Sequence, residues 1–231
     1  MKIMNFDTQY FLGLLFSARF FDAIWQVVWI TTCAMAVGIV IGVTGGLILT
    51  SPLKFLHPIV KGYVAFYRGV PVLVQIVFWY NGLSAVTGGA VSLPAVAAGV
   101  LALGVNEGAY MTEIIRSGIQ SVERGQREAS QALNLSYFSM MRKIILPQAF
   151  RIAMPPTGNE VINVIKNTTL LYMIAVPEMF GAAVNIYSQN FKYFEVLCVV
   201  AIWYIAIAST YTLLQGLLER RMNHGRKPLF N

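Results

Sequence analysis

The sequence predicts an all-α integral membrane protein with five transmembrane helices. Of its 231 residues, 57% are hydrophobic and only 12% are charged, with a mean hydropathy of +0.63. Soluble domains are usually about one quarter charged. The charges are clustered, and they leave uncharged gaps of 31, 38 and 23 residues, at 23–53, 69–106 and 196–218. This composition excludes a disordered or fibrous protein and disfavours a water-soluble enzyme.

The gaps place the five spans along a single transmembrane domain, residues 1–231. A hydrocarbon core about 30 Å thick needs roughly 20 helical residues, because every backbone group must be satisfied within the segment. The second gap is split at Leu83–Pro94, a break rich in Gly, Ser, Thr and Pro. The fourth span is apolar except for Glu160, Lys166 and a run of Asn and Thr. The spans are expected at residues 24–49, 60–83, 93–115, 156–175 and 196–218.

Two other readings of the apolar runs fit less well. A signal peptide needs a basic start and a short apolar core, whereas the first gap begins late and is too long. Transmembrane β-barrels need alternating strands of about ten residues, and these runs are continuously apolar. Cys33 and Cys198 both fall within predicted spans, so no structural disulfide is expected.

Basic residues predict the orientation, because cytoplasmic loops carry an excess of Lys and Arg. With five spans the two termini lie on opposite sides. Three basic residues in or beside spans, Arg68, Arg116 and Lys166, are left out of the comparison. With the N-terminus outside, eleven fall on the inner side: Lys54, Lys61, Arg124, Arg127, Arg142, Lys143, Arg151, Arg220, Arg221, Arg226 and Lys227. Only Lys2, Arg19 and Lys192 fall outside, so the N-terminus is expected outside and the C-terminus in the cytoplasm.

The hydrophilic segment 117–154 is expected on the cytoplasmic side. A short helix over Gln126–Leu133 would show Ala129, Ala132 and Leu133 on one side, with Asn134 as its C-cap, since Asn tolerates the left-handed conformation. A second helical piece, Tyr137–Leu146, is expected to stop at Pro147. Such a loop either transmits force to a docked partner or rests on lipid headgroups, and physical reasoning alone leaves both open.

Four motifs in this chain resemble a known family. GQREASQALNLSYFSMMRKIILPQAFR, with Glu128-Ala129-Ser130 and Ile144-Ile145-Leu146-Pro147, is similar to the EAA loop of binding-protein-dependent ABC importer permeases. Asn134 stands where that family has Gly, and both residue types tolerate positive φ. FYRGVPVLVQ from Phe66, NEGAYMTEIIRSGIQSVERGQ from Asn106 and PPTGNEVINVIKNTTL from Pro155 resemble its polar amino-acid branch. The resemblance runs from about residue 25 to residue 221.

The resemblance implies a type I ABC importer permease in the bacterial cytoplasmic (inner) membrane, forming a solute path by alternating access. Its expected partners are a second permease subunit, identical or paralogous, a cytoplasmic ABC ATPase dimer and an extracytoplasmic amino-acid-binding protein. The EAA loop, around Glu128 to Pro147, would couple to the ATPase. The residues expected at that contact are Gly125, Glu128, Ala129, Ala132, Leu133, Asn134 and Leu135.

The chain is not expected to be an enzyme. It has no G-x-x-x-x-G-K-[ST] phosphate loop, so ATP and magnesium are expected at the partner ATPase and no cofactor in this chain. We find no catalytic triad, metal-ligand set or pair of carboxylates with working spacing. The basic residues lie where anionic headgroups would be, so nucleic acid is not an expected partner.

Polar residues within the spans predict the solute path, because polar groups are costly in a membrane. On the fourth span Glu160, Asn163 and Asn167 share one helical face at i, i+3 and i+7, and they could bind an amino-acid zwitterion. The alternative is that Asn and Thr hold helices together. Lys166 is expected to have a packing role, since the family motif carries Lys there whatever its substrate.

Two further patches extend this prediction. On the third span Glu107 and Tyr110 share a face, and Glu107 stands where the family motif has a small or neutral residue, which points to a particular, cationic substrate. On the second span Arg68, Gly69 and Pro71 interrupt a helix and form a candidate gate or hinge, or only a packing kink. Gln75, four residues after Pro71, could line the path.

Gly38 and Gly42 in the first span have G-x-x-x-G spacing, which predicts a close helix contact within the subunit or across a dimer.

Two other functional classes are weighed against the importer subunit. A secondary carrier or channel driven by an ion gradient usually shows more spans and inverted repeats, and no repeat is evident here. The hydrophilic segment 117–154 would also have no evident use in a carrier. A membrane enzyme would need catalytic residues that the sequence does not offer.

Overall fold

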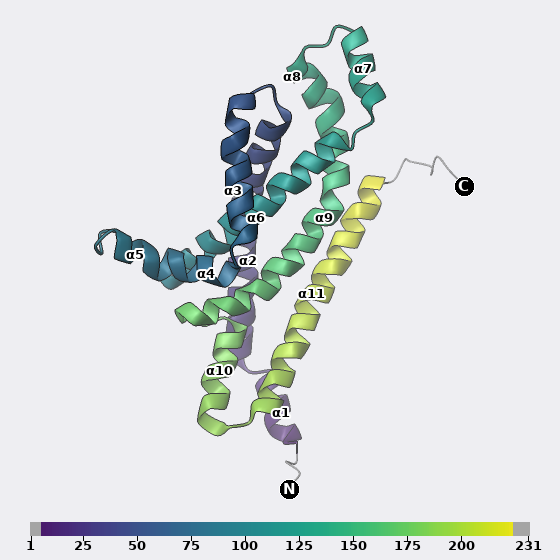
Figure 1. Ribbon diagram of the computed structural model, residues 1–231. Coiled ribbons are helices and arrows are strands. Elements are labelled where there is room, and N and C mark those ends of the chain that lie inside the picture. Colours follow the sequence, from purple (N-terminus) through teal and green to yellow (C-terminus); the bar gives the residue numbers. More distant parts are fainter. Residues whose placement is uncertain (1–5, 224–231) are drawn as a thin grey trace.

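A computed structural model describes residues 6–223 of the chain, and within them every regular element is helical. Lys2, Arg226 and Lys227, used above to predict orientation, lie outside the described residues. Figure 1 shows an elongated body with α7 and α8 at one end, α1 and α10 at the other, and α4 and α5 projecting sideways. The helices are α1 (Thr8–Leu15), α2 (Ala18–Thr50), α3 (His57–Gly69), α4 (Val72–Val77), α5 (Leu83–Val86), α6 (Ala95–Gln120), α7 (Arg124–Ala132), α8 (Tyr137–Met140), α9 (Leu146–Asn167), α10 (Met179–Asn190) and α11 (Tyr193–Asn223).

Glycines let α2 and α6 pack with their backbones close together. A Cβ built on Gly42 would lie 2.1 Å from the Cβ of Met111, and one on Gly38 would lie 2.9 Å from the Cβ of Glu107. The reverse also holds, since a Cβ on Gly104 would lie 2.8 Å from the Cβ of Val37. We call this contact the glycine seam, with Gly38, Gly42, Gly45 and Gly46 of α2 and Gly104 and Gly108 of α6. The predicted G-x-x-x-G contact therefore lies within the subunit.

The predicted second span, 60–83, is not one straight helix. It is broken between α3 and α4, where the helical segments Lys54–Gly69 and Val72–Val86 meet at 105°. Pro71 cannot donate a backbone hydrogen bond, and Val70 is extended, with ψ of 132°. The predicted interruption at Pro71 is confirmed, and it is sharp enough to turn α4 and α5 away from the body (Figure 1).

The expectation that Pro147 stops a helical segment is wrong. Pro147 does not end a helix, because a π-helical turn at Met141–Ile145 leads directly into α9 and places Pro147 in its first turn. A missing N–H costs little there. The helix that contains the first part of the predicted fourth span, 156–175, therefore begins at Leu146, and α9 runs through Pro155 and Pro156. Prolines inside membrane helices are tolerated when neighbouring helices satisfy the freed groups.

The short helices α1 and α10 are absent from the sequence expectations. Asp7 caps α1 by accepting a hydrogen bond from the backbone N–H of Tyr10, and it forms a 2.6 Å ion pair with Lys192 just before α11. The hydrogen bond from Lys192 lowers the pKa of Asp7 below its ordinary value. Trp203 of α11 donates to the carbonyl of Leu15 at 3.0 Å, so α1 is held against α11 at both ends.

Length and composition identify two helices in the described chain that could cross a membrane alone, α2 and α11. The predicted spans 24–49 and 196–218 lie inside them. Two bent helix pairs raise the number to four if each is one span. The predicted span 93–115 falls almost entirely in α6, which is long enough but is not one of these two helices. The count of five and the orientation of the termini stay predictions.

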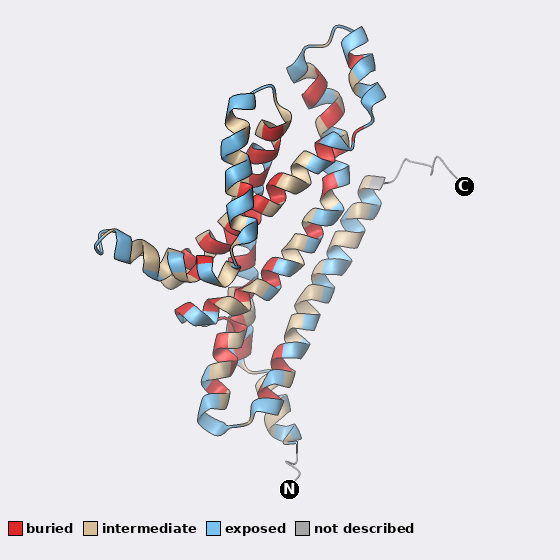
Figure 2. Cartoon of the chain, viewed as in Figure 1, coloured by how far each residue is buried: buried red, intermediate tan, exposed pale blue. Residues whose placement is uncertain are grey.

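Burial differs between the helices of the core. Figure 2 shows many buried residues along α6 and few along α11 beyond its first turns. One cluster of buried side chains joins α2, α4, α6 and α9, and a second joins α2, α9, α10 and α11. The centre of the molecule is therefore α6, and α11 lies at its edge.

The glycine seam predicts the effect of adding one methyl group. Gly42→Ala should lower the free energy of unfolding by about 1–3 kcal/mol, because the new Cβ would overlap Met111. The measurement is the melting temperature of the purified chain in detergent. Gly216→Ala in α11, where a Cβ meets no atom within 4 Å, is the matched control and should be neutral or slightly stabilising. Equal melting temperatures for the two variants would contradict the seam.

Candidate functional site

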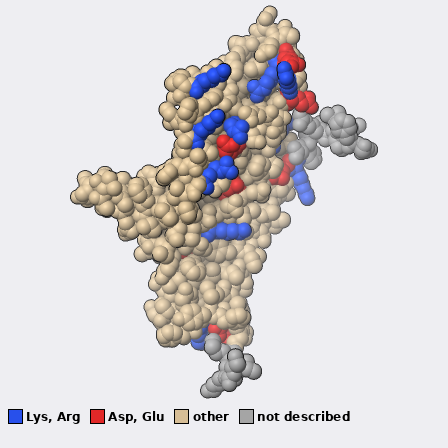
Figure 3. Space-filling view, in the orientation of Figure 1, with Lys and Arg blue, Asp and Glu red and all other residues tan. Residues whose placement is uncertain are grey.

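A polar pocket of about 420 Å³ lies where the break after α3 meets α6 and α9. Figure 3 shows basic and acidic side chains close together in the middle of this face, over α3, α6 and α9, whereas the projecting α4 and α5 carry none on this face. We call it the central pocket. Its lining residues are Arg68, Gly69, Val70, Pro71 and Val72 from the break, Asn106, Glu107 and Tyr110 from α6, and Glu160, Asn163, Lys166 and Asn167 from α9.

The central pocket brings together almost all the residues that the sequence proposed for the solute path and the gate. They come from three segments that are distant in the chain, and they are Glu160, Asn163, Asn167, Glu107, Tyr110, Arg68, Gly69 and Pro71. Lys166, for which a packing role is expected, is exposed and lines the same pocket. The solute role of these residues stays a prediction.

Gln75 lies behind the break instead of in the pocket lining. Its side chain is only 4% exposed, and its Nε2 donates to the carbonyl oxygens of Tyr67 at 3.0 Å and Val70 at 2.8 Å. Asn106 Nδ2 donates to Gln75 Oε1 at 3.1 Å and also to the carbonyl of Tyr67 at 3.0 Å. The two amides satisfy carbonyl groups that the break at Pro71 leaves without helical partners, and so they join α6 to the break.

One supporting residue was not singled out from the sequence. The hydroxyl of Tyr63 on α3 donates to the carbonyl of Val105 on α6 at 2.6 Å, which fixes α3 beside the pocket. Tyr63 and Tyr67 stand at i and i+4, and their rings are in contact at a tilt of 53°, with centroids 5.0 Å apart. The sequence did carry a signal for this support: two tyrosines at i and i+4 in an apolar run, where each buried hydroxyl needs a hydrogen-bond partner.

The pocket holds charges of both signs that are not paired with one another. Arg68 places its guanidinium carbon 5.3 Å from the centre of the Tyr110 ring, a cation–π distance. Asn163 Nδ2 donates to Glu160 Oε2 at 3.1 Å, so these two residues form one hydrogen-bonded pair. Within the described part of the chain, no ion pair joins Glu107 or Glu160 to Arg68 or Lys166. The pocket can therefore offer separate positive and negative groups to a ligand.

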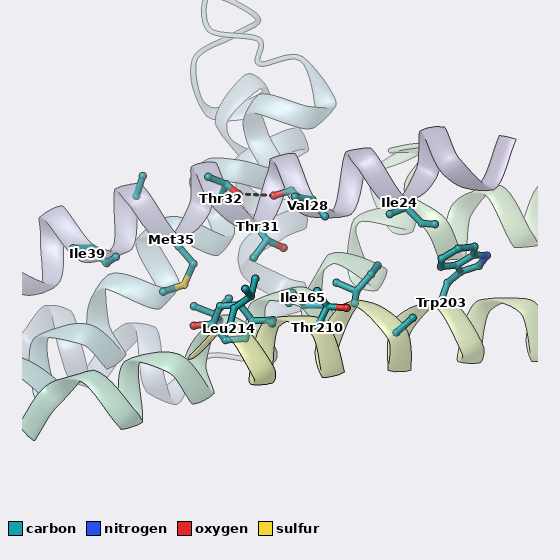
Figure 4. A pocket seen from close by; sticks show the side chains of 15 residues that line it. Ile24, Val28, Thr31, Thr32, Met35, Ile39, Ile165, Trp203, Thr210 and Leu214 are labelled. Carbon is teal, nitrogen blue, oxygen red and sulfur yellow. Dashed lines mark hydrogen bonds between the residues drawn. The ribbon is translucent and has the colours of Figure 1, made fainter. Parts of the chain in front are cut away.

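A larger hollow of about 630 Å³ between α2, α9 and α11 has different chemistry. In Figure 4 the labelled side chains of α2 lie along one side and Trp203, Thr210 and Leu214 of α11 along the other. The lining is mostly apolar and includes no charged residue. Thr32 uses its hydroxyl on its own helix, donating to the carbonyl of Val28 at 2.8 Å. This hollow therefore offers hydroxyl groups but no charged group to a small polar solute.

The described residues contain no group of three or more His, Cys, Asp and Glu side chains placed to hold a metal ion. Cys33 and Cys198 are both free thiols.

At one end of the body, α7 presents an exposed surface. The helix runs over Arg124–Ala132 and ends slightly earlier than predicted, and Asn134 has the expected left-handed conformation, with φ of 52°. Gly125, Glu128, Ala129, Ala132, Leu133 and Asn134 are all exposed. Leu133 reaches 73% exposure, although it is a large apolar residue.

Contacts beneath α7 hold it in place. Arg127 Nη2 donates to the carbonyl of Ile119 at 2.9 Å, and the backbone N–H of Leu135 donates to the carbonyl of Ser130 at 3.1 Å. Leu135 packs against a buried cluster that includes Ile119 and Ile145, where the end of α6 meets the π-helical turn before α9. A force on α7 would therefore reach α6 and α9, which both line the central pocket.

Residues 34–224 match the family described as "Binding-protein-dependent transport system inner membrane component". A probable amino-acid permease protein of Bacillus subtilis, YxeN, is 37% identical over 207 residues, which cover 88% of this chain and 92% of that protein. The arginine transport system permease protein ArgU of Corynebacterium glutamicum is 36% identical over 225 residues, which cover 91% of this chain and 70% of that protein. The glutamine transport system permease protein GlnP of Escherichia coli is 35% identical over 194 residues, which cover 84% of this chain and 88% of that protein.

Solved structures show the same fold. One described as an amino acid ABC transporter with histidines has a TM-score of 0.86 and 32% identity, covering 94% of this chain and 100% of that one. An inward-facing MetNI methionine ABC transporter has a TM-score of 0.74 at 17% identity, covering 87% and 94%, and supports the fold alone.

Removing the Gln75 amide should destabilise the chain. Gln75→Leu keeps a side chain of similar size but leaves the carbonyl of Val70 without its donor, and leaves the Tyr67 carbonyl and the Asn106 amide with one hydrogen bond fewer, which should cost about 1–3 kcal/mol. Thermal unfolding in detergent measures this effect separately from transport. Gln189→Leu, at an exposed site on α10, is the control and should change stability little. If both variants unfold at the wild-type temperature, the amide does not support the break.

Proposed function

The chain belongs to the binding-protein-dependent transport system inner membrane components, as a permease subunit of amino-acid ABC importers, and we propose that its central pocket lies on the solute path. The single observation that carries this proposal is the meeting of predicted path residues from α3, α6 and α9 in one polar pocket. No other hollow described above combines carboxylates, cations and amides.

The chemistry of the pocket complements an amino-acid zwitterion. The carboxylate of a solute can accept hydrogen bonds from Arg68 or Lys166, both of which are exposed in the pocket. The ammonium group can donate to Glu160, whose position is fixed by the hydrogen bond from Asn163. Asn167 and Tyr110 add neutral polar groups on the two sides. Charge-assisted hydrogen bonds are the stronger kind, and here each would be made only when solute is present.

The break beside the pocket suits a gate in alternating access. Pro71 removes one helical hydrogen bond and Gly69 loosens the turn before it, so α4 and α5 can change direction without breaking a regular helix. Arg68 is the last charged residue before the break, and its guanidinium lies over the ring of Tyr110 in the pocket. Movement of α4 and α5 would shift Pro71 and Val72 in the pocket lining relative to Arg68.

The exposed surface of α7 is the proposed contact with a cytoplasmic ABC ATPase dimer. Its small apolar residues, Ala129 and Ala132, together with Leu133, are exposed beside Glu128, a composition that suits a groove with an apolar floor. ATP and magnesium would be bound by that ATPase and not by this chain. Closing of the ATPase dimer would move α7, and through it α6 and α9 at the pocket.

The complete importer would contain further subunits. We place two permeases, identical or paralogous, in the bacterial cytoplasmic membrane, with the N-terminus of this chain outside and its C-terminus in the cytoplasm. An extracytoplasmic binding protein would deliver the amino acid. The excess of basic residues on the predicted cytoplasmic side supports this orientation.

Removing the two paired polar groups of α9 tests the solute path. Glu160→Ala and Asn163→Ala should each lower ATP-driven uptake of amino acids at least about tenfold, because the first removes the carboxylate that binds the solute ammonium and the second removes the hydrogen bond that positions this carboxylate. Uptake is measured in proteoliposomes that contain the complete importer. Asn185→Ala, at an exposed position on α10, is the matched control. Unchanged uptake by both α9 variants would refute the path, and amino-acid transport by the chain alone without ATP would favour a carrier.

Reversing a charge on α7 tests coupling. Glu128→Lys should abolish ATP-driven uptake and reduce the ATPase that co-purifies with the permease, while membrane insertion is unaffected. The lost ion pair to Arg124 is itself worth little, because both side chains are well exposed. Asp22→Lys, a charge reversal at an exposed site on α2, should retain the ATPase. Wild-type uptake by Glu128→Lys would show that α7 is not the coupling contact.

A further inference from the structure

Glu107 is a buried carboxylate in the wall of the central pocket. Glu107 is only 4% exposed and lies near the middle of α6, the helix at the centre of the molecule. Its Oε1 atom is buried and accepts no hydrogen bond within the described part of the chain. Buried polar groups are nearly always paired, and an unpaired one calls for an explanation.

Neither cation of the central pocket pairs with Glu107. Arg68 lies over the ring of Tyr110, and no ion pair is formed between Glu107 and either Arg68 or Lys166 in the described residues. The second acid of the pocket, Glu160, accepts from Asn163, whereas Glu107 has no such partner on Oε1. An isolated carboxylate within a membrane helix is costly, and such residues usually mark an ion or substrate path.

The Cβ and Cγ atoms of Glu107 pack in the glycine seam. A Cβ on Gly38 would lie 2.9 Å from both Cβ and Cγ of Glu107, so the side chain packs directly on the backbone of α2. It cannot move back towards α2, because the helices already touch there. Its position in the pocket wall is therefore fixed by packing and does not depend on a polar partner.

We propose that Glu107 binds a second positive charge on the solute, and that this permease selects amino acids with cationic side chains, of the arginine and lysine class. This inference rests on the proposed function of the central pocket. The zwitterion would use Arg68 or Lys166 and Glu160, which leaves Glu107 for the side chain. A neutral amino acid would leave Glu107 unpaired, and an acidic one would add repulsion, so Glu107 discriminates against both.

Direct binding to the permease–ATPase complex, purified in detergent without the binding protein, tests this selectivity. The probes are radiolabelled L-arginine, L-lysine, L-glutamine and L-glutamate. Wild type should bind arginine and lysine at least about tenfold more tightly than glutamine, and glutamate most weakly. Glu107→Gln should weaken arginine binding at least about tenfold and change glutamine binding much less, whereas Glu107→Asp should keep part of the preference.

Glu113→Gln is the matched control, because Glu113 lies on the same helix but forms an ion pair with Arg116 outside the pocket. It should retain the preference for arginine. Equal effects of Glu107→Gln on arginine and glutamine would overturn the selectivity and assign Glu107 a packing role. Tighter binding of glutamine than of arginine by wild type would overturn it too, even if the Glu107 variants fail to assemble.

The experiment separates the two proposals. If glutamine binds and Glu160→Ala abolishes its binding, the solute path stands even when the selectivity of Glu107 fails. If none of the four amino acids binds to a complex that still hydrolyses ATP, both proposals fail.

Discussion

The close packing of α2 on α6 is the constraint on which the rest of the structure depends. Their glycines let the two helices approach so closely that a Cβ added at a glycine would overlap atoms of the facing helix. Dispersion contacts along the seam replace the hydrophobic driving force that lipid does not supply. This contact fixes α6, and α6 carries Asn106, Glu107 and Tyr110 to the pocket. An apolar contact on one face of α6 thus sets the position of the polar residues on another.

A polar pocket in such a molecule needs support from behind as well as from its lining. The break at Pro71 exposes carbonyls, and the amides of Gln75 and Asn106 satisfy them within the protein. Because these bonds are internal, the residues that face the pocket keep free donors and acceptors. Rigid support and an unpaired lining are therefore two results of one arrangement.

The sequence predicted those features that depend on local chemistry. Uncharged length predicted α2 and α11, helical spacing grouped Glu160 with Asn163, and residue type predicted the break at Pro71 and the left-handed Asn134. It could not predict a 105° bend, since proline fixes a break but neighbouring helices fix the angle. The start of α9 was missed because a π-helical turn before Pro147 has no clear sequence signal, and α1 and α10 because short helices give weak hydropathy patterns.

The glycine seam also has a consequence for how the chain is made. Gly38 and Gly42 are synthesised well before their partners on α6, and the broken segment from α3 to α5 lies between them. At about 5–20 residues per second, α2 waits several seconds in the membrane with its backbone face uncovered. During biogenesis the first span is therefore the part most open to a wrong neighbour, and the arrival of α6 ends that interval.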